Sequence, residues 1–239
     1  MQYSSRNLAC LATCLTLFAS AGTPVAAPAF DNEQLRYSIN WPSGLSLGEA
    51  QLGSSLQKTT AEAAPLLHLE FNLDAAVPGF VVTDRYRSEA SPELCSVEFQ
   101  RKAMHGQKKT DEKTTFDQHA GTATRETVGG GKSQFEISSC GRDALAFLYY
   151  LRRELSQGRI PPPQTVYFGG AYEIRLAFSG TQTIRLGEAQ VEADRVTASV
   201  KGTASDISFD VFFLKDAART PALVRLPLAL GMFSMELVR

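Results

Sequence analysis

Apolar and polar residues alternate along several stretches of this 239-residue chain. In residues 67–73, every second residue is a large apolar one and the residues between them are polar. A period of two is typical of a β-strand with one buried face. It favours antiparallel pairing, because strands of parallel sheets read as continuous apolar runs. The pattern predicts strands over residues 35–41, 67–73, 172–178, 207–213, 224–230 and 233–237.

Two of the expected strands change their apolar face partway along. In residues 44–53 the change falls at Gly48 and Glu49, and a similar slip occurs near Asp194 and Arg195. A glycine at such a change indicates a β-bulge, which bends the strand. Bends of this kind let a sheet curl towards a barrel.

One segment, residues 142–157, has helical spacing instead. Ser139 is the expected N-cap, with Asp143 in the first turn near the positive end of the helix dipole. Gly158 is the expected C-terminal cap, and the prolines at 161–163 prevent continuation. The apolar positions of this helix are Ala144, Phe147, Leu148, Leu151 and Leu155. We therefore expect a mainly β fold: a curled antiparallel sheet or incomplete β-barrel with one amphipathic helix packed on or in it.

Two polar segments read as connections. Residues 107–115 hold three lysines and predict an exposed hairpin arm, whose charges face solvent. The three glycines at 129–131 predict a turn between strands at 121–128 and 132–137. The sequence shows no internal repeat and no linker long enough to divide domains, so residues 30–239 are expected to form a single β-rich domain.

The first 29 residues have the layout of a secretory signal peptide. Arg6 precedes an apolar run at 8–19, and an A-x-A site ends at Ala29. We expect cleavage after Ala29, or after Ala27 as second choice, which makes the protein exported and periplasmic. An uncleaved anchor or a buried helix is the alternative reading. Lipid attachment at Cys14 is disfavoured, because threonine before this cysteine is atypical. No later segment approaches the length of a membrane helix.

Removal of the signal peptide leaves two cysteines, Cys95 and Cys140. An even pair in an exported chain favours a disulfide. Two separate buried thiols are the alternative. A redox site is disfavoured, because the chain has no C-x-x-C motif.

Composition and charge exclude some classes of function. The formal net charge is −1 with 44% hydrophobic residues, which is typical of neither a nucleic-acid-binding protein nor a disordered chain. Without Arg6, the expected mature chain has 23 basic and 25 acidic residues, a net charge of −2.

The motifs for common chemistries are incomplete. Residues 131–133 mimic the end of a phosphate-binding loop, but Glu126 stands where the motif needs glycine. His68, His105 and His119 have no metal-ligand spacing, so we expect neither a metal nor a cofactor. No G-x-S-x-G elbow supports a serine nucleophile.

The acidic residues that could act in catalysis also suit structural positions. These residues are Asp84, Asp117, Asp143 and Asp216. Each suits a turn or a cap, so we expect structural roles. Asp216 and Arg219 are expected to form a local ion pair in a turn, and a ligand role for Arg219 is the alternative.

Short motifs along nearly the whole mature chain resemble the exported bacterial domain-of-unknown-function family DUF3108. They are YSINW at 37–41, GLSLG at 44–48, VTDR at 82–85, CGRDALAFLYYLR at 140–152, and the stretch from 221 that ends in GMFSMEL at 231–237. The resemblance implies no activity and no catalytic residues. The family is similar in architecture to periplasmic lipoprotein carriers, open antiparallel barrels whose concave face holds acyl chains.

A sheet of this size has more apolar surface than one helix covers. We therefore expect a non-enzymatic envelope protein that binds a lipid or another apolar ligand. Plain core packing is the alternative role for the expected lining residues, which are Phe147, Leu148, Tyr150, Leu151, Phe209, Val211 and Phe213. The alternative function is a structural or assembly module of the envelope, acting through contacts with a protein partner. An enzyme is disfavoured.

Overall fold

The computed structural model describes residues 30–57, 65–77, 79–203, 206–228 and 231–239. The expected signal peptide, residues 1–29, lies outside the described residues, so its cleavage stays a prediction.

The described residues form fifteen strands and one helix. The strands are β1 (Glu33–Asn40), β2 (Ser46–Gln57), β3 (Leu66–Val77), β4 (Phe80–Ala90), β5 (Ser96–His105), β6 (Lys108–Asp117), β7 (Thr122–Thr127), β8 (Lys132–Glu136), β9 (Arg142–Asp143), β10 (Gln164–Tyr167), β11 (Ala171–Leu186), β12 (Ala189–Lys201), β13 (Asp206–Leu214), β14 (Pro221–Leu228) and β15 (Gly231–Leu237). The helix, α1 (Ala144–Ser156), follows β9. Every alternating segment overlaps a strand, and positions 229–230 lie outside the described residues.

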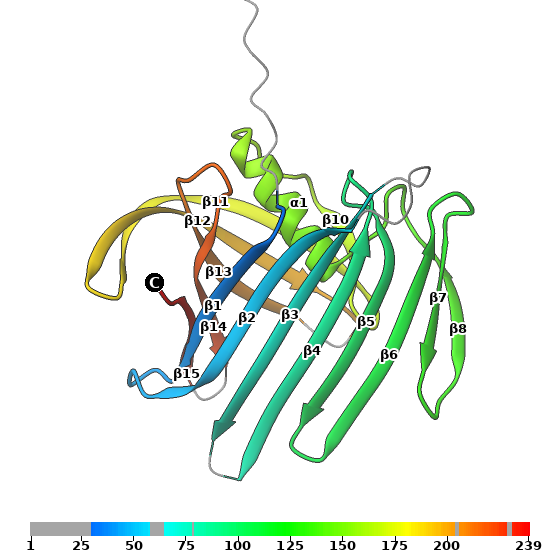
Figure 1. Ribbon diagram of the computed structural model, residues 1–239, viewed down its shortest axis with the longest axis horizontal. Helices are drawn as coiled ribbons and strands as arrows, with labels where there is room; N and C mark the ends of the chain where they lie inside the picture. The colour runs from blue at the N-terminus through cyan, green and yellow to red at the C-terminus, as the bar shows by residue number, and fades with distance from the viewer. Residues whose placement is uncertain (1–29, 58–64, 78, 204–205, 229–230) are drawn as a thin grey trace, which may run out of the picture.

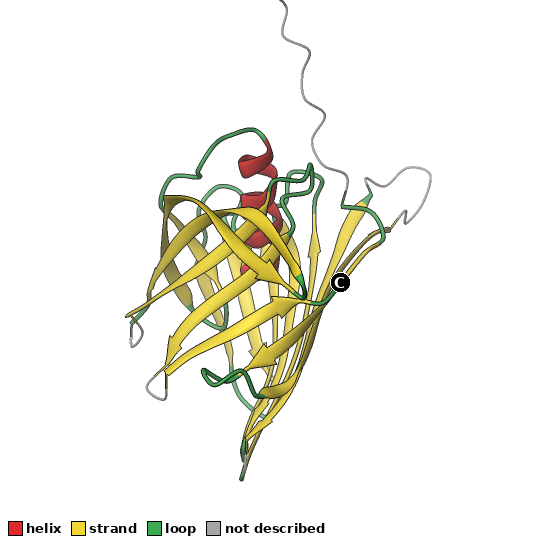
Figure 2. Ribbon diagram, turned by 90° about the vertical axis from the view of Figure 1, so that its left-hand side faces the viewer, coloured by secondary structure: helices red, strands yellow, loops and turns green. Residues whose placement is uncertain are grey.

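All of these strands belong to one sheet. Its order is β8-β7-β6-β5-β4-β3-β2-β1-β15-β14-β13-β12-β11-β10-β9, and neighbours are antiparallel except β9 and β10. The first and last strands pair with each other, so the two halves of the chain meet at the middle of the sheet. The sheet curls but does not close into a barrel, because β8 and β9 are its two ends (Figures 1 and 2). The prediction of a mainly β, curled antiparallel sheet with one helix is confirmed.

Both predicted changes of face lie at shifts in strand register. The pairing of β1 with β2 skips Leu47, which precedes Gly48. A Cβ at Gly48 would lie 2.0 Å from the carbonyl oxygen of Asp74 on β3, so the strands approach this closely only with glycine. The second shift leaves residues 179–180 of β11 opposite Arg195 of β12. Such bulges bend the strands and add twist.

Beyond the second bulge, the β11–β12 hairpin curls round beside β13 and β14 (Figure 1). Ile184, Leu186 and Ala193 of this hairpin form a separate apolar cluster with Phe212 and Leu223. Phe212 is fully buried in this cluster, whereas its neighbours Val211 and Phe213 are buried on the opposite face of β13. The bent hairpin therefore buries apolar residues on both faces of the strands that it covers.

The helix begins later than predicted. Its N-cap is Asp143, not Ser139, because the Asp143 carboxylate accepts hydrogen bonds from the N–H groups of Leu145 and Ala146. The C-terminal prediction is confirmed: Gly158 has a φ of +71° and donates its N–H to the carbonyl of residue 155, and Arg159 donates to residue 154. This pair of bonds is the Schellman motif, which favours glycine.

Asp143 also ties the helix start to the sheet. Its carboxylate accepts hydrogen bonds from the hydroxyls of Ser88 on β4, at 2.6 Å, and Ser96 on β5, at 2.5 Å. Asp143 is completely buried. Burial raises the pKa of Asp143, while the two hydroxyls and the two helix N–H groups oppose that shift. Next to it, Cys95 and Cys140 form the predicted disulfide, with Cα atoms 4.7 Å apart.

A buried ion pair anchors the middle of α1. Arg152 binds both carboxylate oxygens of Glu33 on β1 at 2.6 Å, and its Nε donates to the carbonyl of Ala218 at 3.0 Å. Its guanidinium also lies 4.7 Å from the ring centroid of Phe30 and 4.8 Å from that of Tyr149. Burial lowers the pKa of Arg152, but the Glu33 carboxylate outweighs burial and raises it.

Two local predictions need correction. Arg219 pairs with Asp194 of β12 at 2.7 Å rather than with Asp216, which instead accepts the N–H of Thr220. Residues 107–115 are not a separate arm: most of them form β6, which pairs with β5 on one side and β7 on the other. The predicted glycine turn at 129–131 is confirmed between β7 and β8.

Candidate functional site

The concave face of the sheet carries an apolar groove of about 490 Å³ between β1–β4 and β14–β15. A volume of a few hundred Å³ is typical of sites that bind small molecules. The groove is lined by Ile39, Trp41, Leu47, Leu73, Ala75, Ala76, Val77, Phe80, Val82, His105, Val224, Leu226, Leu228, Phe233, Ser234 and Met235.

The lining side chains are large but incompletely buried. Leu73, Leu226 and Phe233 are half-buried, and Leu228 is 45% exposed. Trp41, the only tryptophan of the chain, packs edge-on against Phe233 with ring centroids 4.9 Å apart. At a concave site, covering apolar surface that is in contact with water is favourable.

A second hollow, of about 240 Å³, lies beside α1 and shares Val224 and Met235 with the apolar groove. The two hollows are therefore neighbours on the concave face. The predicted lining residues found in this second hollow are Phe147, Leu148, Leu151, Phe209 and Val211.

The other two predicted lining residues lie elsewhere. Tyr150 stacks beneath the guanidinium of Arg142, which lies 3.9 Å from its ring centroid. Phe213 is completely buried among apolar residues that include Leu151 and Val196. For Phe213, the alternative of plain core packing describes its surroundings.

Sequence reasoning missed the larger hollow, the apolar groove. The signal was present, because Leu226, Leu228, Phe233 and Met235 alternate with other residues in the predicted strands. The pattern does not show that β1 pairs with β15, and this pairing places these residues beside Trp41.

Few polar side chains reach the apolar groove. His105 and Ser234 line it, and His105 Nε2 lies 2.9 Å from the carboxylate of Asp84. The Asp84 side chain is only 11% exposed, whereas that of His105 is 48% exposed. Burial raises the pKa of the neighbouring Tyr86, and the Asp84 charge raises it further. The arrangement offers one hydrogen-bonding imidazole at the edge of an apolar surface.

Two arginines farther along the concave face contact other residues of the protein and do not face an open hollow. Arg101 of β5 lies 4.8 Å from the ring centroid of Phe168 and donates to the carbonyl of that residue at 3.3 Å. Arg125 of β7 donates to the carbonyl of Gly169. Both therefore fix the β10–β11 turn against the sheet.

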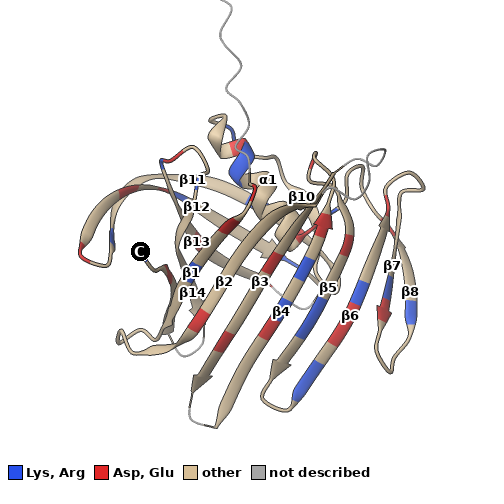
Figure 3. Ribbon diagram, viewed as in Figure 1, with Lys and Arg blue, Asp and Glu red and all other residues tan. Residues whose placement is uncertain are grey.

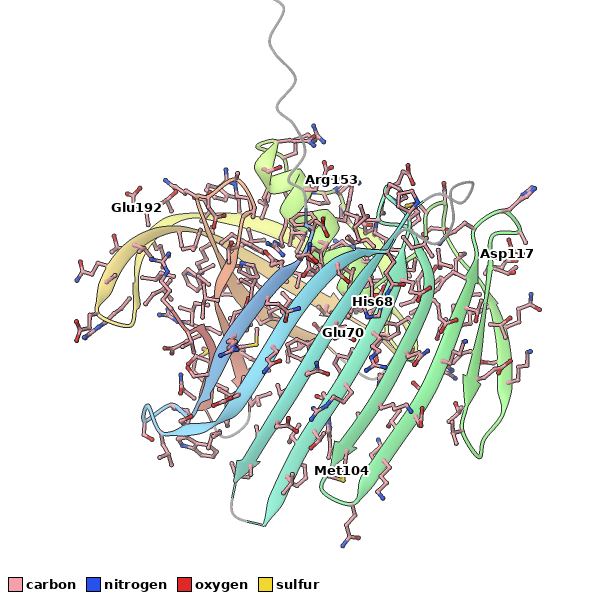
Figure 4. All side chains as sticks on the ribbon, in the orientation of Figure 1. His68, Glu70, Met104, Asp117, Arg153 and Glu192 are labelled. Atoms are coloured by element: carbon pink, nitrogen blue, oxygen red, sulfur yellow. A yellow bond between two sulfur atoms is a disulfide. The ribbon has the colours of Figure 1, made fainter. Side chains whose placement is uncertain are left out.

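The remaining candidates from the sequence have structural partners or face solvent. His68 and Glu70 lie close together on β3 (Figure 4), with 3.0 Å between His68 Nε2 and the carboxylate. Asp117 accepts the backbone N–H groups of residues 119 and 120 in the β6–β7 turn. His119 is exposed. Lys132 begins strand β8 and pairs with Glu126 at 2.7 Å, so residues 131–133 do not open a helix.

Two features are absent from the described residues. No group of three or more His, Cys, Asp or Glu side chains is placed to hold a metal ion in this part of the chain. Within the same residues, no helix has the length and apolar content needed to cross a membrane.

Comparison with known proteins identifies the family. Residues 36–238 match the family described as "Protein of unknown function (DUF3108)", so the chain belongs to this family. No curated protein matches the sequence. Among solved structures, the fold is similar to a β-barrel-like protein of domain of unknown function DUF1849 from Brucella abortus, with a TM-score of 0.59 and 9% identity over 88% of this chain and 97% of that chain. At this identity the likeness concerns the fold alone.

Proposed function

We propose that this DUF3108 protein is a non-enzymatic protein of the cell envelope that binds a lipid or another hydrophobic ligand in the apolar groove. The observation that carries the proposal is the half-buried state of large apolar side chains around a hollow of about 490 Å³. Full burial of such a side chain is favourable by about 1.5–3 kcal/mol relative to full exposure. A ligand that completes this burial at several positions gains affinity from each.

The shape of the site favours a ligand with a long alkyl chain. The apolar groove and the second hollow share Val224 and Met235, so apolar hollows follow one another from the β3–β4 end of the sheet to α1. A compact ligand would leave much of these hollows uncovered. His105 and Ser234 provide hydrogen-bonding groups for a polar head at the side of the apolar groove.

The proposed location rests on two features. Residues 1–29 have the signal-peptide layout, and the Cys95–Cys140 disulfide suits an oxidising compartment such as the periplasm. Export would place the apolar groove in the envelope, where lipid ligands are abundant.

Trp41 gives a direct assay, because it lines the groove and is the only tryptophan. We expect protein expressed with its leader and purified without detergent to carry a bound lipid in native mass spectrometry. We also expect titration of delipidated protein with palmitate to change Trp41 fluorescence saturably. Recovery of only the bare chain mass, together with no saturable fluorescence change, would contradict the proposal.

A matched pair of variants separates groove binding from surface adsorption. Ala75→Phe fills the groove from β3, whereas Ala177→Phe adds the same ring at an exposed position on β11. The ring takes up groove volume that a ligand would occupy, so Ala75→Phe should weaken palmitate binding about tenfold or more, a loss of at least about 1.4 kcal/mol. Ala177→Phe should leave it unchanged.

A role in envelope assembly is the second candidate, and the sheet edge at β8 favours it. In the described sheet β8 pairs only with β7, and its side chains are mostly exposed. Such an edge is a template for strand addition by a partner. A photo-crosslinker at Gln134 of β8 should then capture one reproducible partner in cells, and one at Ala177 should not.

A further inference from the structure

Exposed hydrophobic side chains gather at the end of the sheet away from α1. They lie in or beside the β1–β2, β3–β4 and β14–β15 hairpins, and we call them the apolar mouth. The apolar mouth consists of Leu45 (66% exposed), Phe80 (46%), Val81 (47%), Leu228 (45%) and Met232 (47%). These exposures are high for large apolar residues, and contiguous apolar patches of this kind mark interaction sites.

The sheet order brings these three hairpins together. Strands β14, β15, β1, β2, β3 and β4 are consecutive in the sheet, so the hairpins that join them form one rim (Figure 1). Phe80 and Leu228 belong both to this rim and to the lining of the apolar groove. The apolar mouth therefore opens directly into the groove.

Positive charge lies beside the apolar mouth. The next hairpin, β5–β6, carries the exposed residues Lys108 and Lys109. Neither lysine forms an ion pair with any residue that the structure describes. Figure 3 shows the contrast, with basic residues at the lower end of β6 and uncharged residues at the lower ends of β3 and β4.

We propose that the apolar mouth inserts its exposed side chains into the surface of a lipid bilayer, with Lys108 and Lys109 against anionic headgroups. Peripheral binding of this type combines buried apolar area with attraction to anionic lipids. The charge pattern favours a lipid surface over a second copy of this near-neutral chain, because the two lysines lie beside the apolar mouth and pair with no acidic residue that the structure describes. Continuity with the groove gives a path for a lipid between the bilayer and its binding site, and in this respect the inference rests on the proposed function.

Vesicle co-sedimentation tests the docking. The full mature protein is mixed with vesicles of phosphatidylethanolamine and phosphatidylglycerol, and separately with vesicles of phosphatidylcholine alone. We expect stronger binding to the anionic vesicles, reduced by added salt. Lys108→Gln with Lys109→Gln should weaken binding to the anionic vesicles about 30-fold and leave binding to neutral ones unchanged.

A triple variant tests the apolar contribution. Leu45→Glu, Val81→Glu and Met232→Glu change exposed tips that do not line the apolar groove, and should weaken vesicle binding about 100-fold or more. The matched control places glutamate at three exposed apolar positions outside the mouth, Leu56, Phe178 and Val238, and should bind as the wild type does. Thermal unfolding of each variant checks that the fold is kept.

Three outcomes would overturn the inference. The first is wild-type protein that stays in the supernatant with anionic vesicles at low salt. The second is an equal loss of binding in the triple variant and its control. The third is self-association of the wild type that the triple variant abolishes, which would assign the apolar mouth to a second copy.

The same variants distinguish failure of the groove proposal from failure of the docking proposal. The triple variant should still bind palmitate in solution, whereas Ala75→Phe should lose palmitate and still bind vesicles. A protein that docks on vesicles but takes up no palmitate refutes the proposed function alone.

Discussion

Asp143→Ala removes a side chain on which four buried donors depend. The hydroxyls of Ser88 and Ser96 and the N–H groups of Leu145 and Ala146 all donate to this carboxylate. Loss of an N-cap costs about 1 kcal/mol, and each buried donor left without a partner costs about 1–3 kcal/mol. With some relaxation, we expect the free energy of unfolding to fall by about 3–5 kcal/mol.

Urea unfolding followed by circular dichroism measures this loss, with the disulfide kept oxidised. The control is Asp216→Ala, which removes a single hydrogen bond at an exposed aspartate and should cost less than about 1 kcal/mol. If Asp143→Ala stayed within about 1 kcal/mol of the wild type, the argument that this residue joins α1 to β4 and β5 would be refuted. An equal loss in both variants would refute it too.

Asp143→Asn tests the protonation state of the same group. The amide oxygen still accepts the two helix N–H groups, and the serine hydroxyls can turn to accept from its NH₂ group. Burial raises the pKa of folded Asp143 above its ordinary value of 3.8, so its stabilising contribution is present at low pH and is lost as pH rises through the folded pKa. We therefore expect the wild type to lose stability relative to Asp143→Asn between acid and neutral pH. A difference that grows in the wild type's favour would contradict this direction.

Three further changes test other parts of the fold. Replacing both cysteines of the disulfide by serine should lower the free energy of unfolding by about 4 kcal/mol, and reducing agent should have the same effect on the wild type. Arg152→Met leaves the buried carboxylate of Glu33 without its partner and should cost about 3–5 kcal/mol, part of which Glu33→Gln should restore in urea unfolding of the double variant. Gly48→Ala forces a Cβ against the backbone of β3 and should lower the melting temperature, whereas Gly131→Ala, with open space around it, should not.

The local features of the fold follow from the sequence because they depend on neighbouring residues. Alternation predicted six of the strands, the shift of face at Gly48 predicted a bulge, and Gly158 predicted the helix end. The errors arise where residues that are distant in the sequence determine a cap or an ion pair. Asp143 rather than Ser139 caps α1, because strands β4 and β5 supply hydroxyls to it, and Arg219 pairs with an aspartate 25 positions away rather than with its neighbour.

The same limit applies to the candidate site. Five of the seven lining residues predicted from α1 and β13 lie together, because a helix over a curled sheet has to contact its apolar face. The larger apolar groove needs the pairing of β1 with β15 at the ends of the chain, and alternation carries no information on partners. The apolar mouth depends further on which hairpins share an edge of the sheet. Sequence reasoning therefore found the part of the site nearest the helix and missed the part that opens to the outside.

The two ends of the molecule differ in the interactions that their side chains make. The end with α1 is held by a disulfide, by the hydrogen bonds of the buried Asp143 and by the Glu33–Arg152 ion pair, and breaking any of them costs about 3–5 kcal/mol. At the opposite end, apolar side chains line the groove and its mouth while remaining half-exposed. A curled sheet can keep such a hollow only if its curvature is fixed elsewhere, because apolar walls that are free to move would collapse onto each other. The bonds around α1 supply that constraint, so variants that loosen them should reduce ligand binding at the groove before the protein unfolds.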